Sequence, residues 1–462
     1  MMIRQTVYRI EKSTVAQMDE RLDAEVLAAL WNGFCYRVGE LTPKAGERNR
    51  IAIGEARFLP LGDNEEYTVS VTERGIGILA RDAASLVRGF CALLVRMEMR
   101  EKDALCVPCA EIRSAFTVAR RMIHLCIFPE TDLSMLKRLV RLCGVLSYTH
   151  VVLEFWGTLR YDCLRELAWD HAFSKEEIAP IIREARALGM EPIPMINHLG
   201  HAASCRIDTG KHVVLDQNPA LQYLFTPDGW CWNIFSGEAR ALLKQMRNEL
   251  YELFGAGEYF HVGCDEAHIF SSNYYPENGI SDYLRALTRE VAAEGRRPIL
   301  WGDMILPYDC NSDKPEKYTA AWERSRATRK LLDALAPDSV IADWHYDTKK
   351  VPVETVLEYQ KAGFAVLGCP WDTLANIDAH YATAREHDSY GLMMTTWHTL
   401  HANLSAILYF ARKCGFPKTD WSDASGHRNL EIATLLRRVS PTPLSYAETG
   451  FAHRQIKEVI DW

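Results

Sequence analysis

From about residue 120 onward, short apolar segments alternate with helical stretches, and this pattern restricts the fold more than any other feature of the chain. Such alternation is typical of βα units that build a parallel sheet. Strands buried on both faces are apolar throughout, as the Val-Val-Leu run at 151–153 is. Eight strands are predicted, at residues 122–128, 150–155, 191–196, 259–263, 298–302, 340–344, 364–368 and 392–396.

Eight successive βα units predict an α/β protein whose core is a closed (β/α)8 barrel (TIM barrel). An open doubly wound sheet is the alternative, but no Gly-x-Gly-x-x-Gly turn follows an early strand. Helices are expected between the strands, for example at 132–145, 175–188, 237–254 and 353–362.

The rest of the chain predicts two smaller parts. Residues 1–113 have the pattern of a small α+β domain, in which 102–113 is interpreted as a linker into the barrel at 114–415. Residues 416–462 are expected to form a helical extension packed on the barrel. In the first domain we predict helices at 19–33 and 85–99, and strands at 50–58 and 67–72.

Composition and charge narrow the partners. The 462 residues carry a formal net charge of −8, which argues against nucleic acid or an anionic membrane, because both need a cationic face. No run reaches the ~18 apolar residues of a membrane span. The N-terminus lacks the apolar core of a signal peptide, and the 13 scattered cysteines suggest reduced thiols, so we expect a cytoplasmic protein. The sequence leaves a homo-oligomer open.

The active site of a (β/α)8 barrel lies at the carboxyl ends of its strands. Tryptophan stands at or just after five of the eight predicted strand ends, and carboxylates occur at several of the same places. Flat aromatic walls with a few fixed carboxylates suit a pyranose ring, whereas phosphate substrates would require Gly-rich loops and basic residues. The polar and aromatic residues at these ends include Glu154, Trp156, Asn197, His201, Trp301, Asp303, Trp344, Tyr346, Trp371 and Trp397.

Asp265 and Glu266 stand out among the strand-end residues. They follow an apolar strand and a glycine, which places two neighbouring carboxylates at the mouth of the barrel. Partial desolvation and a second carboxylate nearby both raise a carboxyl pKa, as a general acid working near neutral pH requires.

Residues 261–266 read His-Val-Gly-Cys-Asp-Glu and resemble the His-x-Gly-Gly-Asp-Glu motif of glycoside hydrolase family 20, the β-N-acetylhexosaminidases. Upstream, residues 197–201 are similar to the family segment that ends in Pro-Gly-His. Residues 67–99 resemble the small α+β domain that precedes the family's barrels. The resemblance therefore extends from the N-terminal domain to about residue 410.

This resemblance implies a retaining exo-β-N-acetylhexosaminidase that needs no cofactor and no metal and whose partner is a carbohydrate. It implies that Glu266 is the general acid and base, and that Asp265 supports the 2-acetamido group of the substrate as it attacks C1. Tyr346 is the expected donor to the acetamido oxygen, beside walls formed by Trp301, Trp344 and Trp397. The other expected substrate-binding residues are Arg120, Glu154, Asn197, His201, His261 and Trp371.

Several positions depart from the family pattern. Cys264 replaces the second glycine of the motif, Asn197 replaces an aspartate, and Thr399 stands where a glutamate is common. Arg120 precedes a second arginine instead of a glycine, and Glu154 ends a strand that usually ends in a His-rich segment with an aspartate. These changes fall among the residues with which the family recognises sugar hydroxyls. Glu154 and the Trp-His-Tyr run at 344–346 resemble a divergent, hexosaminidase D-like branch of the family. They leave the choice between gluco and galacto sugars open.

Three other functions are compatible with these residues. A metal-dependent barrel hydrolase could use His198, His201, His261 and His268, although residues 123–126 read Ile-His-Leu-Cys where such barrels have His-x-His. A glycan-binding protein without catalysis could share the fold. A glycosidase with a protein nucleophile would need a second carboxylate about 5 Å from Glu266, for which Asp303 and Glu154 are candidates.

Overall fold

A computed structural model describes residues 6–35, 40–46, 48–101, 104–203, 214–267, 279–306, 331–397, 400–417 and 427–440. The chain forms two compact units. One is Arg113–Lys418, and the other combines Met1–Ile112 with Thr419–Trp462.

The larger unit is a closed barrel of eight parallel strands that follow one another in chain order, which confirms the predicted architecture. Every strand begins and ends within about two residues of its predicted range. The strands are β10 (Arg121–Ile127), β11 (His150–Phe155), β12 (Glu191–Met195), β13 (Tyr259–His261), β14 (Arg297–Trp301), β15 (Val340–Asp343), β16 (Ala365–Gly368) and β17 (Gly391–Thr395).

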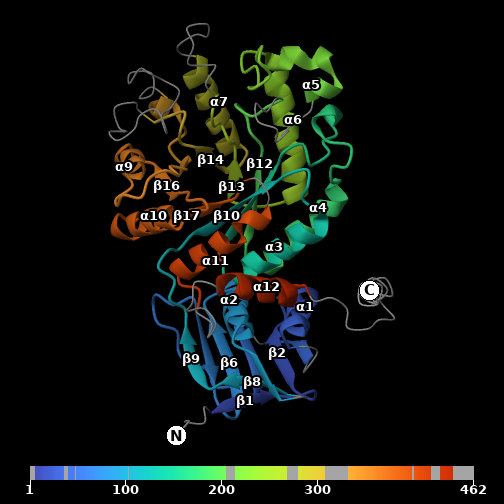
Figure 1. Cartoon of the computed structure of the whole chain (residues 1–462), viewed down its shortest axis with the longest axis vertical. Helices are drawn as coiled ribbons and strands as arrows, with labels where there is room; N and C mark the ends of the chain where they lie inside the picture. The colour runs from blue at the N-terminus through green and yellow to red at the C-terminus, as the bar shows by residue number, and fades with distance from the viewer. Residues whose placement is uncertain are drawn as a thin grey trace, which may run out of the picture. The chain divides into compact units, whose positions relative to one another are not determined.

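Helices surround the barrel strands (Figure 1). Local signals place their ends: the Asp132 side chain accepts from the Met135 amide, and Ser174 and Glu177 form a reciprocal capping box. Gly255, with φ of 66°, ends α6, the longest of the described barrel helices. These helices are α3 (Leu133–Val145), α4 (Lys175–Ala187), α5 (Val214–Gln217), α6 (Gly237–Phe254), α7 (Gly279–Ala293), α9 (Glu354–Lys361), α10 (Leu374–Glu386) and α11 (Leu404–Lys413).

The barrel interior is filled by inward-facing side chains, which alternate along each strand. Met122 and Met393 belong to this core, with Trp301 and Cys369 closer to the carboxyl ends of their strands. His124 continues the inward row of β10 two residues after Met122 and is completely buried. A polar side chain therefore lies inside the barrel, next to its apolar core.

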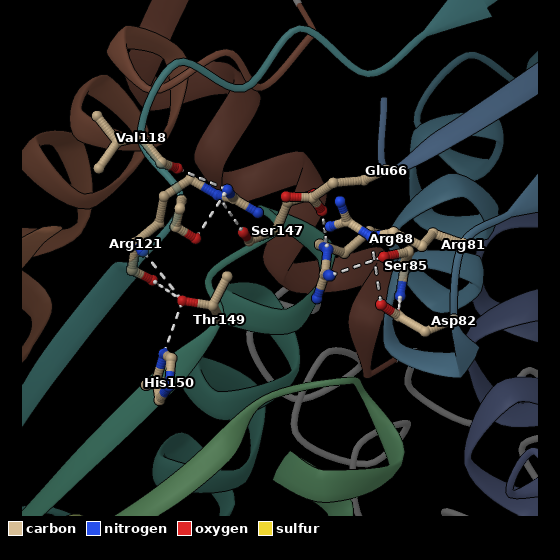
Figure 2. Close-up of polar contacts among 11 residues, drawn as sticks. Glu66, Arg81, Asp82, Ser85, Arg88, Val118, Arg121, Ser147, Thr149 and His150 are labelled. Carbon is tan, nitrogen blue, oxygen red and sulfur yellow. Dashed lines mark hydrogen bonds and ion pairs between the residues drawn. The ribbon is translucent and has the colours of Figure 1, made fainter. Parts of the chain in front are cut away.

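Arg121, which is 2% exposed, fixes the start of β10. Its guanidinium donates to the carbonyl oxygens of Ser147, at 3.0 Å, and Val118, at 2.8 Å, as Figure 2 shows. The Phe116 ring lies 3.7 Å from the same guanidinium. These contacts satisfy buried carbonyl groups in the turns around the first two barrel strands.

The smaller unit contains a six-stranded sheet in the order β3-β2-β4-β6-β5-β9 and a three-stranded sheet in the order β1-β8-β7. Helix α1 (Ala24–Cys35) contacts β3, and α2 (Ala83–Leu94) packs on β5 and β6. The Trp31 and Phe90 rings of the two helices stack at 6.1 Å. The strands are β1 (Val7–Ile10), β2 (Val15–Asp19), β3 (Glu40–Lys44), β4 (Arg50–Gly54), β5 (Tyr67–Val71), β6 (Gly75–Ala80), β7 (Glu98–Glu101), β8 (Ala104–Pro108) and β9 (Ala110–Arg113).

A buried ion pair stabilises α2 within this unit. Arg88 donates to the Glu66 carboxylate at 2.6 Å and to the Ser85 hydroxyl at 3.1 Å (Figure 2). Asp82 caps the helix by accepting from the Ser85 amide at 2.7 Å. The expected α+β domain is thus present, with its helices and strands held by local and long-range contacts.

Two predictions for the ends of the barrel were wrong. The segment 102–113 is not a simple linker, because β8 and β9 lie in it and pair within the two sheets of the smaller unit. The extension predicted at 416–462 was expected to pack on the barrel. Its described helix, α12 (His427–Val439), instead packs on α1 and belongs to the smaller unit.

No helix among the described residues is both long and apolar enough to cross a bilayer. The eleven described cysteines are free thiols, and nine of them are buried. The cytoplasmic location and the oligomeric state stay predictions.

Candidate active site

Asp265 and Glu266 lie in a tight turn that directly follows β13. Gly263, Cys264 and Glu266 all have left-handed backbones, with φ of 67°, 74° and 47°. Neighbouring residues in an extended strand would point to opposite sides. Because of the turn, both carboxylates reach one imidazole: His201 Nε2 lies 3.2 Å from Asp265 Oδ2 and 3.1 Å from Glu266 Oε2. The structure therefore unites the predicted pair with the predicted His201.

Two tryptophan rings lie close to His201. Its ring centre is 5.6 Å from that of Trp156, which is nearly parallel, and 4.4 Å from that of Trp230. Trp230 also donates its indole N–H to the carbonyl oxygen of Glu266 at 2.7 Å. Sequence reasoning missed Trp230, which lies in the long connection between β12 and α6. The length of that connection on the active-site side of the barrel was the available signal.

Asp303, two residues after β14, is the third carboxylate of this region and is 2% exposed. Its Oδ2 accepts from the Glu266 amide at 2.8 Å, and its Oδ1 accepts from the Trp344 indole at 3.0 Å. Burial, followed by the charge of nearby Asp265, raises the pKa of Asp303 to about 8. The protonated form of Asp303 is therefore favoured near neutral pH.

The predicted aromatic residues form one connected group. The Trp301 and Trp397 rings lie 6.0 Å apart, and Trp397 donates its indole N–H to the Tyr346 hydroxyl at 2.7 Å. The Tyr346 ring is 5.2 Å from Trp344 and 5.5 Å from Trp371. Burial raises the pKa of Tyr346 well above its usual value, so its hydroxyl stays protonated and remains a hydrogen-bond donor.

A buried polar network lies next to this aromatic group. Glu154 is 2% exposed. One of its carboxylate oxygens accepts a hydrogen bond from His124 Nε2 at 2.8 Å, and the other accepts one from the Asn197 side-chain amide at 3.1 Å. The His124 ring is 4.8 Å from Trp397. Glu154 and Asn197 were predicted site residues and are brought together. His124 was not predicted, although the two-residue alternation from Met122 places it inside the barrel.

His261 is fully buried and supports the turn. Its Nδ1 accepts the Gly263 amide at 3.1 Å, and burial holds its pKa well below the usual value, so the ring is neutral. With Nδ1 accepting, the proton lies on Nε2, and neither nitrogen is arranged as a metal ligand. The ring centre lies 4.5 Å from Trp301.

Other metal candidates are limited. His198 Nδ1 lies 2.8 Å from the Ile196 carbonyl and its Nε2 lies 3.2 Å from Arg247, so both nitrogens are engaged. Among the described residues, ligand atoms of His201, Asp265 and Glu266 all lie within 4.8 Å of one another, which is close enough to hold an ion. His268, part of the metal alternative, and Thr399, one of the departures, lie outside the described residues.

Arg120 was predicted to bind a sugar hydroxyl, and the structure corrects this. Its guanidinium lies 3.3 Å from the Tyr259 hydroxyl and 3.8 Å from the centre of the Tyr390 ring. Tyr259 begins β13 and Tyr390 precedes β17, so Arg120 lies at the amino ends of the strands, opposite Asp265 and Glu266. Side chains at that end of a barrel serve stability.

The catalytic-domain family called glycosyl hydrolase family 20 matches residues 152–422, more than half of the chain. The chain belongs to glycosyl hydrolase family 20. The match includes the Asp265-Glu266 turn, Asp303 and all the aromatic residues of the group around Tyr346, whereas Arg120 and His124 lie before it.

Individual proteins and solved structures that are similar to this chain agree with the family assignment. Bovine hexosaminidase D is 25% identical over 248 residues, which cover 50% of this chain and 65% of that protein. The chain thus spans less than two thirds of that curated relative's length. A Streptomyces coelicolor β-N-acetylhexosaminidase structure matches with a TM-score of 0.64 at 15% identity and 95% coverage of each chain. A Vibrio harveyi exo-β-N-acetylglucosaminidase in complex with N-acetylglucosamine matches with a TM-score of 0.64 at 14% identity, covering 95% of this chain and 76% of that one. At these identities the structural likeness shows the fold.

Proposed function

We propose that this family-20 hydrolase is a retaining exo-β-N-acetylhexosaminidase that removes terminal β-linked N-acetylhexosamine by substrate-assisted catalysis. The observation that carries the proposal is the pair of carboxylates held on one histidine, Asp265 and Glu266 on His201, next to the aromatic group around Tyr346. Relatives named as β-N-acetylhexosaminidases, and the N-acetylglucosamine bound to the Vibrio harveyi enzyme, support this choice of substrate.

The two carboxylates differ in exposure, and this supports different tasks. The Glu266 side chain is 39% exposed and that of Asp265 is 8% exposed. In the first step Glu266 protonates the glycosidic oxygen as the acetamido oxygen attacks C1, which breaks the C1–O bond and forms an oxazolinium ion. In the second step Glu266 takes a proton from the water that adds to C1, the oxazolinium ring opens, and the anomeric configuration is retained.

Asp265 would accept the acetamido N–H and stabilise the positive charge that develops on that nitrogen. A fixed carboxylate in a site with little water can contribute several kcal/mol to this stabilisation. Tyr346 would donate to the acetamido oxygen and so orient it toward C1. The Thr395 hydroxyl, 3.1 Å away, and the Trp397 indole N–H both donate to the Tyr346 oxygen, so the Tyr346 proton is available to a ligand.

A protein nucleophile is the main competing mechanism, and the candidate side chains are already engaged. Asp303 accepts one N–H on each oxygen, and Glu154 is hydrogen-bonded on both oxygens within a buried network. These contacts hold both carboxyl groups in buried positions, and the raised pKa of Asp303 favours its protonated form, which is a poor nucleophile. A glycan-binding protein without catalysis would have no use for a proton donor such as Glu266.

The substrate class is tested with a panel of 4-nitrophenyl glycosides: both β-N-acetyl sugars, β-glucoside and β-galactoside. We expect the sugar without the acetamido group to react at least ~100-fold more slowly, which corresponds to about 2.7 kcal/mol of transition-state stabilisation. Equal rates on the β-glucoside would reject the proposal, and no turnover of any glycoside would favour the binding protein. Glu266→Gln should slow substrates with poor leaving groups by roughly 10²–10⁴-fold.

The mechanism is tested separately by replacing the substrate's acetyl group with progressively fluorinated acetyls. The rates should fall along this series, because fluorine makes the attacking oxygen a poorer nucleophile. An N-acetylhexosamine thiazoline, which copies the cyclised intermediate, should inhibit competitively and more tightly than the free sugar, and Asp265→Asn should weaken it. A flat fluorination series, or a 2-fluoro sugar found covalently on Asp303 or Glu154, would establish the double-displacement mechanism instead.

A further inference from the structure

The carboxyl group of Asp303 bridges two parts of the site that come from different strands. The Glu266 amide belongs to the turn after β13, and the Trp344 indole directly follows β15. Asp303 lies between them after β14 and binds one N–H with each oxygen, at 2.8 Å and 3.0 Å. Because the group is 2% exposed, water does not compete for these contacts.

Each contact holds a residue whose position matters. Glu266 has a φ of 47°, a conformation that a residue with a side chain adopts at some energetic cost and keeps only when its surroundings enforce it. The bond to its amide is such a constraint. Trp344 is partly exposed, and its ring lies 5.2 Å from Tyr346, the expected acetamido donor. One carboxyl group therefore sets the place of the general acid and of the aromatic wall together.

We propose that Asp303 is a positioning residue that couples the proton donor Glu266 to the Trp344 wall of the acetamido site, so that the acid and the reacting acetamido group are aligned by one group. The inference rests on the proposed hexosaminidase function, because the acetamido site is part of that function. Asp303 touches no reacting atom in this role and acts through Glu266 and Trp344.

The charges around Asp303 fit this role. The titratable groups that act on it or face it are Asp265, Glu266 and the buried Cys264 thiol. With its pKa raised to about 8, Asp303 is mostly neutral at pH 7, so it does not itself add a full negative charge beside Asp265. A protonated carboxyl group still has acceptor sites on both oxygens and can keep both N–H contacts.

Substitution by asparagine tests the bridge because it changes one oxygen into an N–H donor. In Asp303→Asn, the introduced NH2 group faces either the Glu266 amide N–H or the Trp344 indole N–H, so that hydrogen bond is lost. We expect kcat to fall roughly 10–100-fold. Trp344→Phe removes the indole donor and leaves a place for the introduced side-chain NH2 group, so in the double variant the remaining amide oxygen can accept from Glu266. We therefore expect the double variant to be at least about fivefold more active than the product of the two single effects.

Asp372→Asn is the matched control. Asp372 is an exposed aspartate that follows strand β16 and accepts a hydrogen bond from the Thr373 hydroxyl. It takes no part in the Asp303 contacts with Glu266 and Trp344. Its kcat should stay within about twofold of the wild type, as surface changes usually do. Independent, multiplicative effects of Asp303→Asn and Trp344→Phe, or an unchanged kcat in Asp303→Asn, would overturn the proposal.

A second measurement does not depend on turnover. The difference in tryptophan emission between the wild type and Trp344→Phe should change with a midpoint near pH 8, where Asp303 loses its proton. The same difference measured in the Asp303→Asn background should lack this transition. If the wild type cleaves no β-N-acetylhexosaminide but the transition is present, the hexosaminidase proposal fails while the Asp303–Trp344 coupling stands. If the emission that Trp344 contributes is the same in the wild type and in the Asp303→Asn background, the coupling itself is rejected.

Discussion

Gly200 lies directly against the backbone carbonyl of Asp265, so that a β-carbon at position 200 would be 2.1 Å from that oxygen. Real β-carbons do not approach a carbonyl this closely, and a backbone atom cannot move aside as the end of a long side chain can. The contact joins the loop after β12, which carries His201, to the turn after β13, which carries the proposed catalytic pair. Any side chain at position 200 must therefore separate His201 from the two carboxylates.

The first prediction follows from this contact. Gly200→Ala should destabilise the protein by about 1–3 kcal/mol, as overpacking of a close contact does, and should lower kcat at least about tenfold, because a misplacement near 1 Å is enough for such a loss. Gly237→Ala is the control: Gly237 is the first residue of α6, and its β-carbon would meet nothing within 4 Å. Urea unfolding and kcat on a 4-nitrophenyl glycoside check both variants. Equal behaviour of the two would show that the loops are not held by this contact.

The second prediction concerns Cys264, which has a φ of 74° and is 1% exposed. Glycine adopts this backbone without strain, whereas a β-branched residue is strongly disfavoured there. Cys264→Gly should remain within about 1 kcal/mol of the wild type, because relief of strain offsets the lost burial of the thiol. Cys264→Val should be destabilised by more than about 2 kcal/mol and lose activity. If the two variants unfold at the same urea concentration, residue 264 does not keep its left-handed backbone in the protein.

The third prediction separates the two ends of the barrel. Arg120→Ala should leave kcat/KM within about threefold of the wild type, since Arg120 is at the amino ends, but should lower stability by about 1–2 kcal/mol through the lost Tyr390 and Tyr259 contacts. Glu154→Gln, at the carboxyl ends, is the comparison and should affect kcat/KM more than Arg120→Ala does. A large rise in KM for Arg120→Ala would restore the role that the sequence first suggested for this residue.

The sequence predicted the barrel well because its evidence is local. Apolar runs such as 151–153 and capping residues such as Asp132 and Ser174 act within a few neighbouring positions, and these fix the strands and the starts of helices. The segment 102–113 was misjudged for the opposite reason. Its strand β8 pairs with the adjacent β7 and also with β1, about a hundred residues earlier, and the pairing with β1 cannot be predicted from neighbouring positions.

The candidate site follows the same division. The end of a barrel strand predicts which edge a residue occupies, so Asp265, Glu266 and the tryptophans were found. Arg120 stands one residue before β10, and its aromatic partners are 139 and 270 positions away, so the direction of its long side chain could not be predicted. Trp230 comes from a connection without barrel strands, and its contact with Glu266 depends on how that connection folds back.

The last prediction concerns stability at acidic pH and begins with His198, which is fully buried. Its Nδ1 lies 2.8 Å from a carbonyl oxygen and its Nε2 lies 3.2 Å from the Arg247 guanidinium, so a second proton on the ring would face a cation. Burial and this cation lower its pKa to about 3. His380 behaves alike, with burial lowering its pKa to about 4, and the pKa of His261 is also well below normal.

The sign follows from proton counts. Below the ordinary histidine pKa of about 6.5, these histidines bind a proton in the unfolded chain but not in the folded chain. The free energy of unfolding therefore falls as the pH falls from about 6.5 toward 4. Each such histidine contributes at most about 1.4 kcal/mol per pH unit to this slope. Asp303 acts in the opposite direction, because its raised pKa makes the folded chain hold a proton between about pH 4 and 8 that the unfolded chain releases. The pH dependence of the wild type therefore sums opposing contributions. The change that a single substitution makes in this dependence isolates the contribution of one group.

His198→Gln keeps one donor and one acceptor and cannot take up the proton. Relative to the wild type, its unfolding free energy should become less dependent on pH between pH 6 and 4, by up to about 1.4 kcal/mol per pH unit. His171→Gln is the control, because His171 is exposed and meets solvent in both the folded and the unfolded chain. Urea unfolding at pH 7, 6, 5 and 4 measures the slopes. A His198→Gln slope equal to that of the wild type and of His171→Gln would show that the imidazole of His198 takes up its proton in the folded protein, and that its contact with Arg247 does not hold the ring neutral.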